Sequence, residues 1–173
     1  MPTPSRPHVH AVNVNPNGGV PKYLVNATTL TAEGVAGDRQ NDRRHHGGPE
    51  RAVCLLGVEV IETLRALGHP ILPGSTGENL TLRGLDWAGL GVGDRLEIGG
   101  RGGAVLEVTA HAPPCKVIAG SFAGGDVRPL SPKLSPGQSR LYARVLVEGR
   151  VRVGDRLRRV AAGTATLDAD AVA

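Results

Sequence analysis

Residues 139–147 of the chain read SRLYARVLV, and apolar and polar side chains alternate along them. Successive side chains of a β-strand point to opposite faces, so strict alternation predicts a strand with two unlike faces. Arg140, Tyr142 and Arg144 share one face, and aliphatic side chains share the other. We expect the aliphatic face to pack into the core and the face with the arginines to line a pocket.

Shorter runs of the same kind occur along the rest of the chain. Further strands are predicted at residues 8–14, 27–32, 52–56, 80–82 and 104–110. Residues 58–67 instead have apolar side chains at helical spacing, and Gly68 follows them as a stop signal. The sequence VGDRL occurs at 92–96 and again at 153–157, where the Gly-Asp pair predicts a turn between short strands. Many short strands with few helices predict a mostly β fold, a closed or nearly closed β-barrel with a few short helices.

The composition is that of one domain with an aliphatic core. Of the 173 residues, 40% are hydrophobic and only 2% are aromatic, so aliphatic side chains must form the core. We expect a flexible arm over residues 1–7, a barrel domain over 8–160 and a flexible tail over 161–173. No segment resembles a signal peptide or approaches the roughly 20 apolar residues that cross a bilayer, so we expect a cytoplasmic protein without a membrane partner.

Cys115 stands directly after Pro113 and Pro114 and directly before Lys116. The prolines end the preceding strand, and the neighbouring ammonium group favours the thiolate, the form of cysteine that attacks electrophiles and binds metals. Cys115 is therefore either a displayed, reactive thiol or a small side chain that fills a corner. Cys54 lies inside an apolar run, and we expect it to be an unreactive core residue.

Residues 39–51 form a polar loop with four arginines, two histidines and the sequence Gly-Gly-Pro. The planar fork of arginine matches phosphate and carboxylate groups. The loop is therefore either a solvated surface or the wall of an anion pocket. The formal net charge of +4 fits a protein with anionic ligands.

Five short motifs follow one another along the chain. They are GVAGDR at 34–39, HGGPERAV at 46–53, GENL at 77–80, Pro-Cys at 114–115 and SRLYARV at 139–145. Together and in this order they resemble the MOSC family, named after the C-terminal domain of molybdenum cofactor sulfurases, and the resemblance spans residues 8–158. It implies a MOSC-like β-barrel whose pocket contains the cysteine of the family, here Cys115.

The resemblance also implies a link with the molybdenum cofactor, a pyranopterin, with Cys115 as the ligand of molybdenum or as a sulfur carrier. Some relatives bind this cofactor through the cysteine and reduce N-hydroxylated bases and amidoximes, whereas others have been proposed to carry sulfur. We therefore expect a stand-alone MOSC protein that reduces a small N-hydroxylated compound with electrons from a redox partner. The alternative is a sulfur carrier that receives a persulfide on Cys115 from a sulfur-donor protein.

Two features set this chain apart from parts of the family. Many relatives have an arginine three residues before the cysteine, where this chain has Ala112, so an expected oxyanion partner is missing. The sulfurases also carry a domain with pyridoxal phosphate ahead of the MOSC domain. The 173 residues leave no room for such a domain, so we expect no pyridoxal phosphate.

A pterin with a terminal phosphate needs arginine forks, backbone N–H groups and partners for its amide and amine edges. The candidates for holding this cofactor are Arg39, His46, Gly47, Gly48, Arg140, Tyr142 and Arg144, with Glu78 and Asn79 for the pterin edges. For each arginine the alternative is a solvated charge, and Tyr142 is alternatively a ring that fills the barrel. His111 lies close enough to Cys115 in sequence to act as a base, although we do not expect it to function.

A basic barrel that binds nucleic acid is the remaining possibility. Barrels that bind single strands stack the bases on aromatic rings, and aromatic residues make up only 2% of this chain. We therefore expect no nucleic-acid partner.

Overall fold

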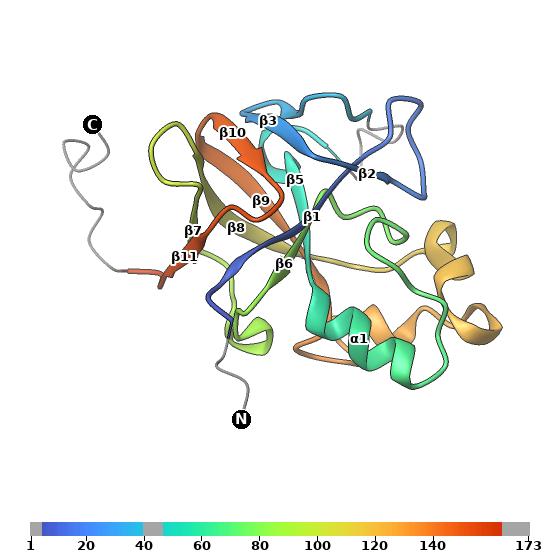
Figure 1. Cartoon of the computed structure of the whole chain (residues 1–173). Helices are drawn as coiled ribbons and strands as arrows, with labels where there is room; N and C mark the ends of the chain where they lie inside the picture. The colour runs from blue at the N-terminus through green and yellow to red at the C-terminus, as the bar shows by residue number, and fades with distance from the viewer. Residues whose placement is uncertain (1–4, 40–46, 164–173) are drawn as a thin grey trace.

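The structure, a computed structural model, describes residues 5–39 and 47–163. In this part of the chain two β-sheets provide most of the regular structure, together with one α-helix and several short 3₁₀ helices (Figure 1). The mostly β fold that the alternating runs predict is confirmed.

The larger sheet has eight strands in the order β11-β7-β8-β9-β5-β6-β1-β2. In chain order these strands are β1 (His8–Val14), β2 (Tyr23–Val25), β5 (Val53–Gly57), β6 (Leu80–Arg83), β7 (Arg95–Ile98), β8 (Ala104–Ala112), β9 (Arg140–Val147) and β11 (Leu157–Val160). The smaller sheet has the order β10-β3-β4, formed by β3 (Ala27–Thr31), β4 (Gly34–Val35) and β10 (Gly149–Arg152). It lies at the end of the molecule opposite the α-helix (Figure 1).

The α-helix, α1 (Val58–Ala66), is the helix predicted at residues 58–67. It connects β5 to β6, which pair parallel, whereas the other strand pairs of the described chain are antiparallel. A parallel pair requires a crossover connection, and α1 supplies it. Its buried side consists of Val58, Val60, Ile61 and Leu64. No helix among the described residues is long and apolar enough to cross a membrane.

The two VGDRL segments form turns, as predicted. Asp94 Oδ2 accepts a hydrogen bond from Gly91 N–H at 3.0 Å, and Asp155 Oδ2 accepts one from Arg152 N–H at 2.8 Å. The turns lead into β7 and β11, and these two strands pair with each other. The repeated sequence therefore marks the entries of two neighbouring strands in one sheet.

The ends of the larger sheet meet only in part. Its end strands, β2 and β11, do not pair with each other in the described chain, and the start of β1 approaches β11 instead. His8 forms a β-bridge with Arg156. Leu157 N–H donates to Pro7 O at 3.0 Å. The sheets of the described chain are therefore not closed into the expected barrel, although β1 and β11 meet at one bridge, and β2 remains an edge.

One hydrophobic core joins both sheets and α1. It contains Leu30 of β3, Leu55 of β5, Ile61 of α1, Leu106 of β8 and Leu141 of β9, each at most 1% exposed. The largest fully buried side chains of the described chain are leucines and isoleucines, so the predicted aliphatic core is confirmed.

A smaller apolar cluster lies on the opposite side of β5, β8 and β9, which we call the outer face. It consists of Cys54, Ala112 and Tyr142, with Ala110 partly buried beside them. Tyr142 is the register partner of both Cys54 and Ala110. The alternation of β9 thus places its polar residues on the outer face, away from the core.

The segment between β8 and β9 contains η3 (Lys116–Ser121), η4 (Ala123–Gly125) and η5 (Arg128–Leu130). These short helices lie near the end of α1, at the lower right of Figure 1. Ala123 N–H donates to His69 Nδ1 at 3.1 Å, and the rings of His69 and Phe122 meet edge to face at 5.7 Å. The sequence predicts a long loop over residues 124–137, which are rich in Pro, Gly and Ser, but the structure forms η4 and η5 at its start and packs the preceding Phe122 and Ala123 against His69.

Candidate functional site

Cys115 occupies the corner between β8 and η3. The strand ends at Ala112, and Pro113 and Pro114 separate it from the cysteine. Cys115 has extended backbone angles, φ −136° and ψ 174°, and its carbonyl accepts a hydrogen bond from Ile118 N–H at 3.2 Å as η3 begins. The side chain of Cys115 is exposed, so the rigid proline corner displays the thiol rather than packing it.

Arg140 holds this corner from inside the protein. The residue is only 4% exposed, and its Nη2 donates to Pro113 O at 3.1 Å while Nη1 donates to Thr76 O at 2.5 Å. No carboxylate of the described chain forms an ion pair with this guanidinium, and its Nε has no hydrogen-bond partner there. Among the described residues, the hydrogen-bond partners of the Arg140 guanidinium are thus two carbonyl groups, and one of them belongs to Pro113, two residues before Cys115.

Arg144 shares the outer face with Arg140 but has carboxylate partners. Its guanidinium binds Glu107 and lies 3.5 Å from Glu50. The hydrogen bond to Glu107 raises the pKa of Arg144 above its ordinary value. The pocket face predicted for β9 is thus divided, because Arg140 is buried at the Cys115 corner whereas Arg144 belongs to a half-exposed ion-pair group.

Tyr142 and Cys54 are the buried side chains at the centre of the outer-face cluster. Burial raises the pKa of Cys54 to about 11 and that of Tyr142 to about 12. The guanidinium of Arg51 stacks over the Tyr142 ring at 5.4 Å. Cys54 is therefore the buried, protonated thiol that its apolar sequence context predicts.

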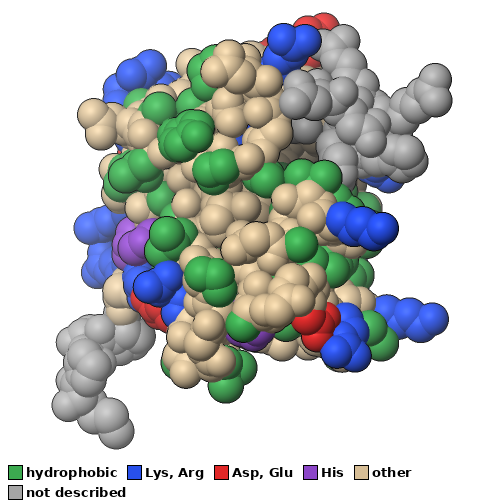
Figure 2. All heavy atoms as spheres, turned by 90° about the vertical axis from the view of Figure 1, so that its right-hand side faces the viewer, with side chains coloured by type: hydrophobic (Ala, Val, Ile, Leu, Met, Phe, Trp, Pro, Cys, Tyr) green, Lys and Arg blue, Asp and Glu red, His purple; other side chains and the backbone are tan. Residues whose placement is uncertain are grey.

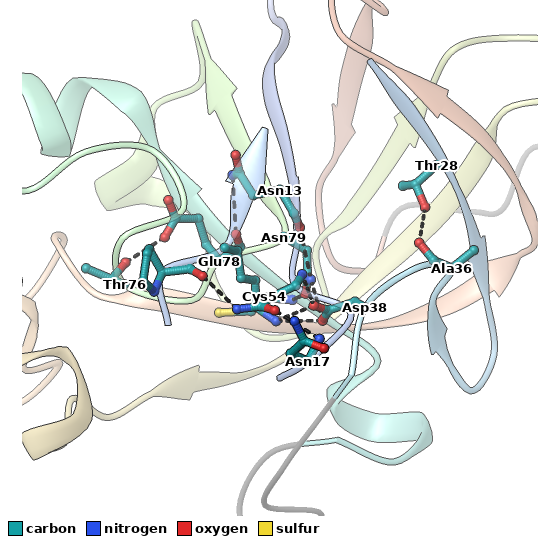
Figure 3. A network of polar contacts seen from close by, with 12 residues as sticks. Asn13, Asn17, Thr28, Ala36, Asp38, Cys54, Thr76, Glu78 and Asn79 are labelled. Atoms are coloured by element: carbon teal, nitrogen blue, oxygen red, sulfur yellow. Dashed lines mark hydrogen bonds and ion pairs between the residues drawn. The ribbon is translucent and has the colours of Figure 1, made fainter. Parts of the chain in front are cut away.

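Glu78 is fully buried and fastens the loop that precedes β6 (Figure 3). Its carboxylate accepts hydrogen bonds from Gly74 N–H, from Thr76 Oγ at 2.6 Å and from Thr81 Oγ at 3.4 Å. Burial raises the pKa of Glu78 above its ordinary value. All three donors come from the protein itself, so the carboxylate orders this loop.

Asn79 connects β5 to Asp38, which follows β4 in the chain (Figure 3). Its Oδ1 accepts from Cys54 N–H at 3.0 Å, and its Nδ2 donates to Asp38 Oδ2 at 3.0 Å. Asp38 in turn forms an ion pair with Lys22 at 2.6 Å, with both side chains at most 6% exposed. The sequence offered no signal for Lys22, because a single lysine in a turn does not reveal a buried partner.

Glu78 and Asn79 were predicted to read the edges of a pterin. Both are fully buried, and the hydrogen bonds of their side chains go to neighbouring protein groups. The structure thus brings the two residues together beneath the outer face but gives them internal partners. Their contact with a ligand stays a prediction.

Arg39, Gly47 and Gly48 lie together around a cavity of about 550 Å³. Its lining also includes the β3–β4 hairpin with Glu33, the following Ala36 and Asp38, and Pro49, the first residue of η1 (Pro49–Arg51). Arg39 is exposed, and Gly48 has φ 80°, a conformation that favours glycine. His46 lies outside the described residues, so its predicted role is untested.

His111 and Ala112 point in different directions. Ala112 is fully buried in the outer-face cluster, at the position where many relatives have arginine. His111 alternates with it and instead contacts Ser139, with Nδ1 and Oγ 2.8 Å apart. His111 is therefore not placed with Cys54 and Tyr142 on the outer face.

The side of the molecule that carries η3 to η5 faces the viewer in Figure 2. Its centre consists of apolar side chains and uncharged atoms, and most Lys and Arg side chains lie toward its margins. Val117, two positions after Cys115, is 64% exposed. The thiol is therefore displayed beside apolar surface.

Comparison with known proteins identifies the class to which this fold and corner belong. The family model of the MOSC domain matches residues 42–158. The chain therefore belongs to the MOSC domain family, as its five motifs indicated.

Individual relatives agree with this assignment. The uncharacterized protein YflK of Bacillus subtilis (strain 168) is 34% identical over 139 residues, which are 79% of this chain and 60% of YflK, so this chain spans less than two thirds of that relative. YuaD from Bacillus subtilis has the same fold, with a TM-score of 0.69 at 18% identity over 88% of this chain and 94% of YuaD. YiiM from Geobacillus stearothermophilus has a TM-score of 0.65 at 25% identity over 96% of this chain and 81% of YiiM.

Proposed function

We propose that this protein binds the molybdenum cofactor at the Cys115 corner and reduces small N-hydroxylated compounds. Membership of the MOSC family, whose domains are associated with this cofactor, supports the binding. The observation that carries the proposal is an exposed thiol on a corner held by Arg140, a buried cation without a carboxylate partner in the described chain.

The residues at the corner fit the cofactor in two respects. A thiolate is a soft ligand and suits a soft metal position. The unpartnered Nε of Arg140 leaves a buried donor on a cation, and an anionic ligand group would stabilise it. In this proposal Cys115 ligates molybdenum and Arg140 attracts the anionic part of the cofactor, while Arg39, Gly47 and Gly48 are the second candidates for its phosphate.

When bound, the cofactor supplies a redox centre from which an N–OH group takes up two electrons and two protons and yields N–H and water. The chain displays the ligand thiol, fixes its backbone and keeps the other thiol, that of Cys54, buried and protonated. The apolar surface beside the corner suits an uncharged organic substrate. The electrons come from a separate redox partner.

Expression in a host that makes the cofactor tests the proposal directly. Molybdenum and pterin content is measured in purified wild type, in Cys115→Ser and in the matched control Cys54→Ala. Wild type and control should contain molybdenum and pterin and should reduce an N-hydroxylated base with a chemical electron donor. Cys115→Ser should contain neither molybdenum nor pterin. Wild-type protein without pterin, or equal loading of all three proteins, contradicts the proposal.

The exposure of Cys115 also supports the sulfur-carrier alternative, since a donor protein must reach the thiol to transfer sulfur. Intact mass spectrometry of the same samples separates the two functions. A mass gain of one sulfur on Cys115, without bound pterin, favours the carrier.

A further inference from the structure

Three consecutive contacts connect the buried carboxylate of Glu78 to the Cys115 corner. Glu78 Oε2 accepts from Thr76 Oγ at 2.6 Å, and the carbonyl of Thr76 accepts from Arg140 Nη1 at 2.5 Å. Arg140 Nη2 then donates to Pro113 O at 3.1 Å. Pro113 is the residue from which the proline corner turns toward Cys115.

We propose that Glu78 is a positioning residue of the Cys115 site, which fixes Thr76, through Thr76 orients Arg140, and through Arg140 holds the corner that displays the thiol. The proposal rests on the proposed function in one respect, namely that Cys115 is the reactive group. It gives Glu78 a role without any contact to ligand or metal.

The arrangement of the two buried charges supports this role. Glu78 and Arg140 have opposite charges, yet they do not touch, and the Thr76 residue lies between them. Thr76 is fully buried, and it is held from one side through its hydroxyl and from the other through its carbonyl. Buried charges are costly unless they are paired, so a direct ion pair would serve stability better than two separate charges. The arrangement instead fixes the position of one peptide group.

The loop around Thr76 is shaped for these contacts. Gly74 gives its N–H to Glu78, has φ 83°, and would place a Cβ 2.4 Å from the carbonyl oxygen of Lys22. A Cβ on Gly77 would lie 4.0 Å from Arg140 Nη1. Glycine at position 74 is thus required where the loop approaches Lys22, and Gly77 lies directly against the guanidinium that the loop orients.

The rest of the polar network leads away from Cys115. Asn79 connects β5 to Asp38, which lies on the other side of Cys54 from Thr76 in Figure 3. Asp38 in turn binds Lys22. Through Thr76 and Arg140 the network reaches Pro113 of the proline corner, whereas Ser75 of the same loop bonds Ser121 at the far end of η3, with the two Oγ atoms 2.8 Å apart. Glu78 is therefore the residue of this network whose substitution should change the structure of the corner at Cys115.

A double-mutant cycle on the full, cofactor-free chain tests the proposal. Amide hydrogen exchange of residues 115–118, which exclude the separate contact of Ser121 with Ser75, is measured in wild type, Glu78→Gln, Arg140→Gln and the double variant. Glu78→Gln keeps the side-chain shape and removes the charge, and it should speed exchange at the corner by about tenfold, which corresponds to about 1.4 kcal/mol. If Glu78 acts through Arg140, the double variant should exchange no faster than Arg140→Gln alone. Additive effects, or an unchanged corner in Glu78→Gln, overturn the proposal.

A spectroscopic signature separates positioning from a general loss of structure. Cys115 is alkylated with a trifluoromethyl reagent, and the fluorine NMR spectrum should show one narrow resonance in wild type and a shifted or split resonance in Glu78→Gln. The matched control Glu107→Gln alters the mostly buried carboxylate that binds Arg144 and should leave the resonance unchanged. Equal changes in both variants, or faster exchange throughout the core strands of Glu78→Gln, overturn the proposal. Because neither measurement involves the cofactor, a missing pterin would reject the proposed function and leave this result standing.

Discussion

Cys54 and Cys115 are the same residue type in opposite surroundings. Cys115 is exposed on a proline corner, whereas Cys54 is buried beside Tyr142 with its pKa raised by burial to about 11. Alkylation requires both access and the thiolate form. Iodoacetamide at neutral pH should therefore modify Cys115 well before Cys54, as peptide mass spectrometry of the native protein can show. Cys115→Ser should remove the fast reaction and Cys54→Ala should keep it; the reverse order would mean that the buried face opens in solution.

The buried carboxylate of Glu78 gives a prediction for stability against pH. Because burial raises its native pKa above the ordinary value of 4.5, its contribution to stability is fully present below that value and is lost as pH rises through the native pKa. At neutral pH, Glu78→Gln should therefore be at least as stable as wild type, and its advantage should shrink near pH 4.5. Urea denaturation at both pH values measures this difference. A variant that is destabilised equally at both would show that the hydrogen bonds of Glu78, and not its charge, dominate its effect.

The junction between β5 and α1 shows how tightly two elements approach each other. Gly57 precedes the helix with φ −74°, which other residues adopt easily, but a Cβ there would lie 3.0 Å from the Trp87 ring. The indole cannot move freely, because its Nε1 donates to Ser139 O at 2.9 Å. Gly57→Ala should therefore lower the free energy of unfolding by about 1–3 kcal/mol through overpacking. Gly91→Ala is the matched control, since nothing lies within 4 Å of its Cβ position, and equal costs in the two variants would show that the steric argument is wrong.

Elements with a local pattern were predicted well. The alternation at 8–14 and the helical spacing at 58–67 depend on side chains within a few residues of one another, and both reappear as β1 and α1. The 3₁₀ helices η4 and η5 were predicted as loop, because a contact such as that between His69 and Phe122 joins residues far apart in sequence. β4 has only two residues, too few to show a period.

The candidate site was predicted in its residues more than in its contacts. The motifs identified Cys115, Glu78, Asn79 and Arg140, and strand alternation identified the face shared by Arg140 and Arg144. The sequence did not reveal that Glu107 binds Arg144, whereas the partners of Arg140 in the described chain are carbonyl groups. Such partners depend on the register between strands and on loop packing, which no local pattern encodes.

At the scale of the whole molecule, the two sheets share one core, although no strand of one pairs with a strand of the other among the described residues. Leu30 and Val151 of the smaller sheet belong to the same buried cluster as Leu106 and Trp87. The sequence pattern gives each strand an apolar face but does not say whether those faces meet in one core or in two. A shared core makes the sheets energetically dependent on each other, so they should unfold as one cooperative unit.

Leu30→Ala tests this dependence. Leu30 is fully buried in β3, and its truncation should lower the free energy of unfolding by about 2–5 kcal/mol. Far-UV circular dichroism reports on both sheets, while fluorescence reports on Trp87, the single tryptophan, which lies outside the smaller sheet. With one core, the two urea transitions of the variant should coincide and shift together from those of wild type.

The control is Leu24→Ala, at a side chain that is 68% exposed, and its free energy of unfolding should stay within about 0.5 kcal/mol of that of wild type. A fluorescence transition that stays at its wild-type midpoint while part of the circular dichroism signal is lost earlier would mean that the smaller sheet unfolds by itself.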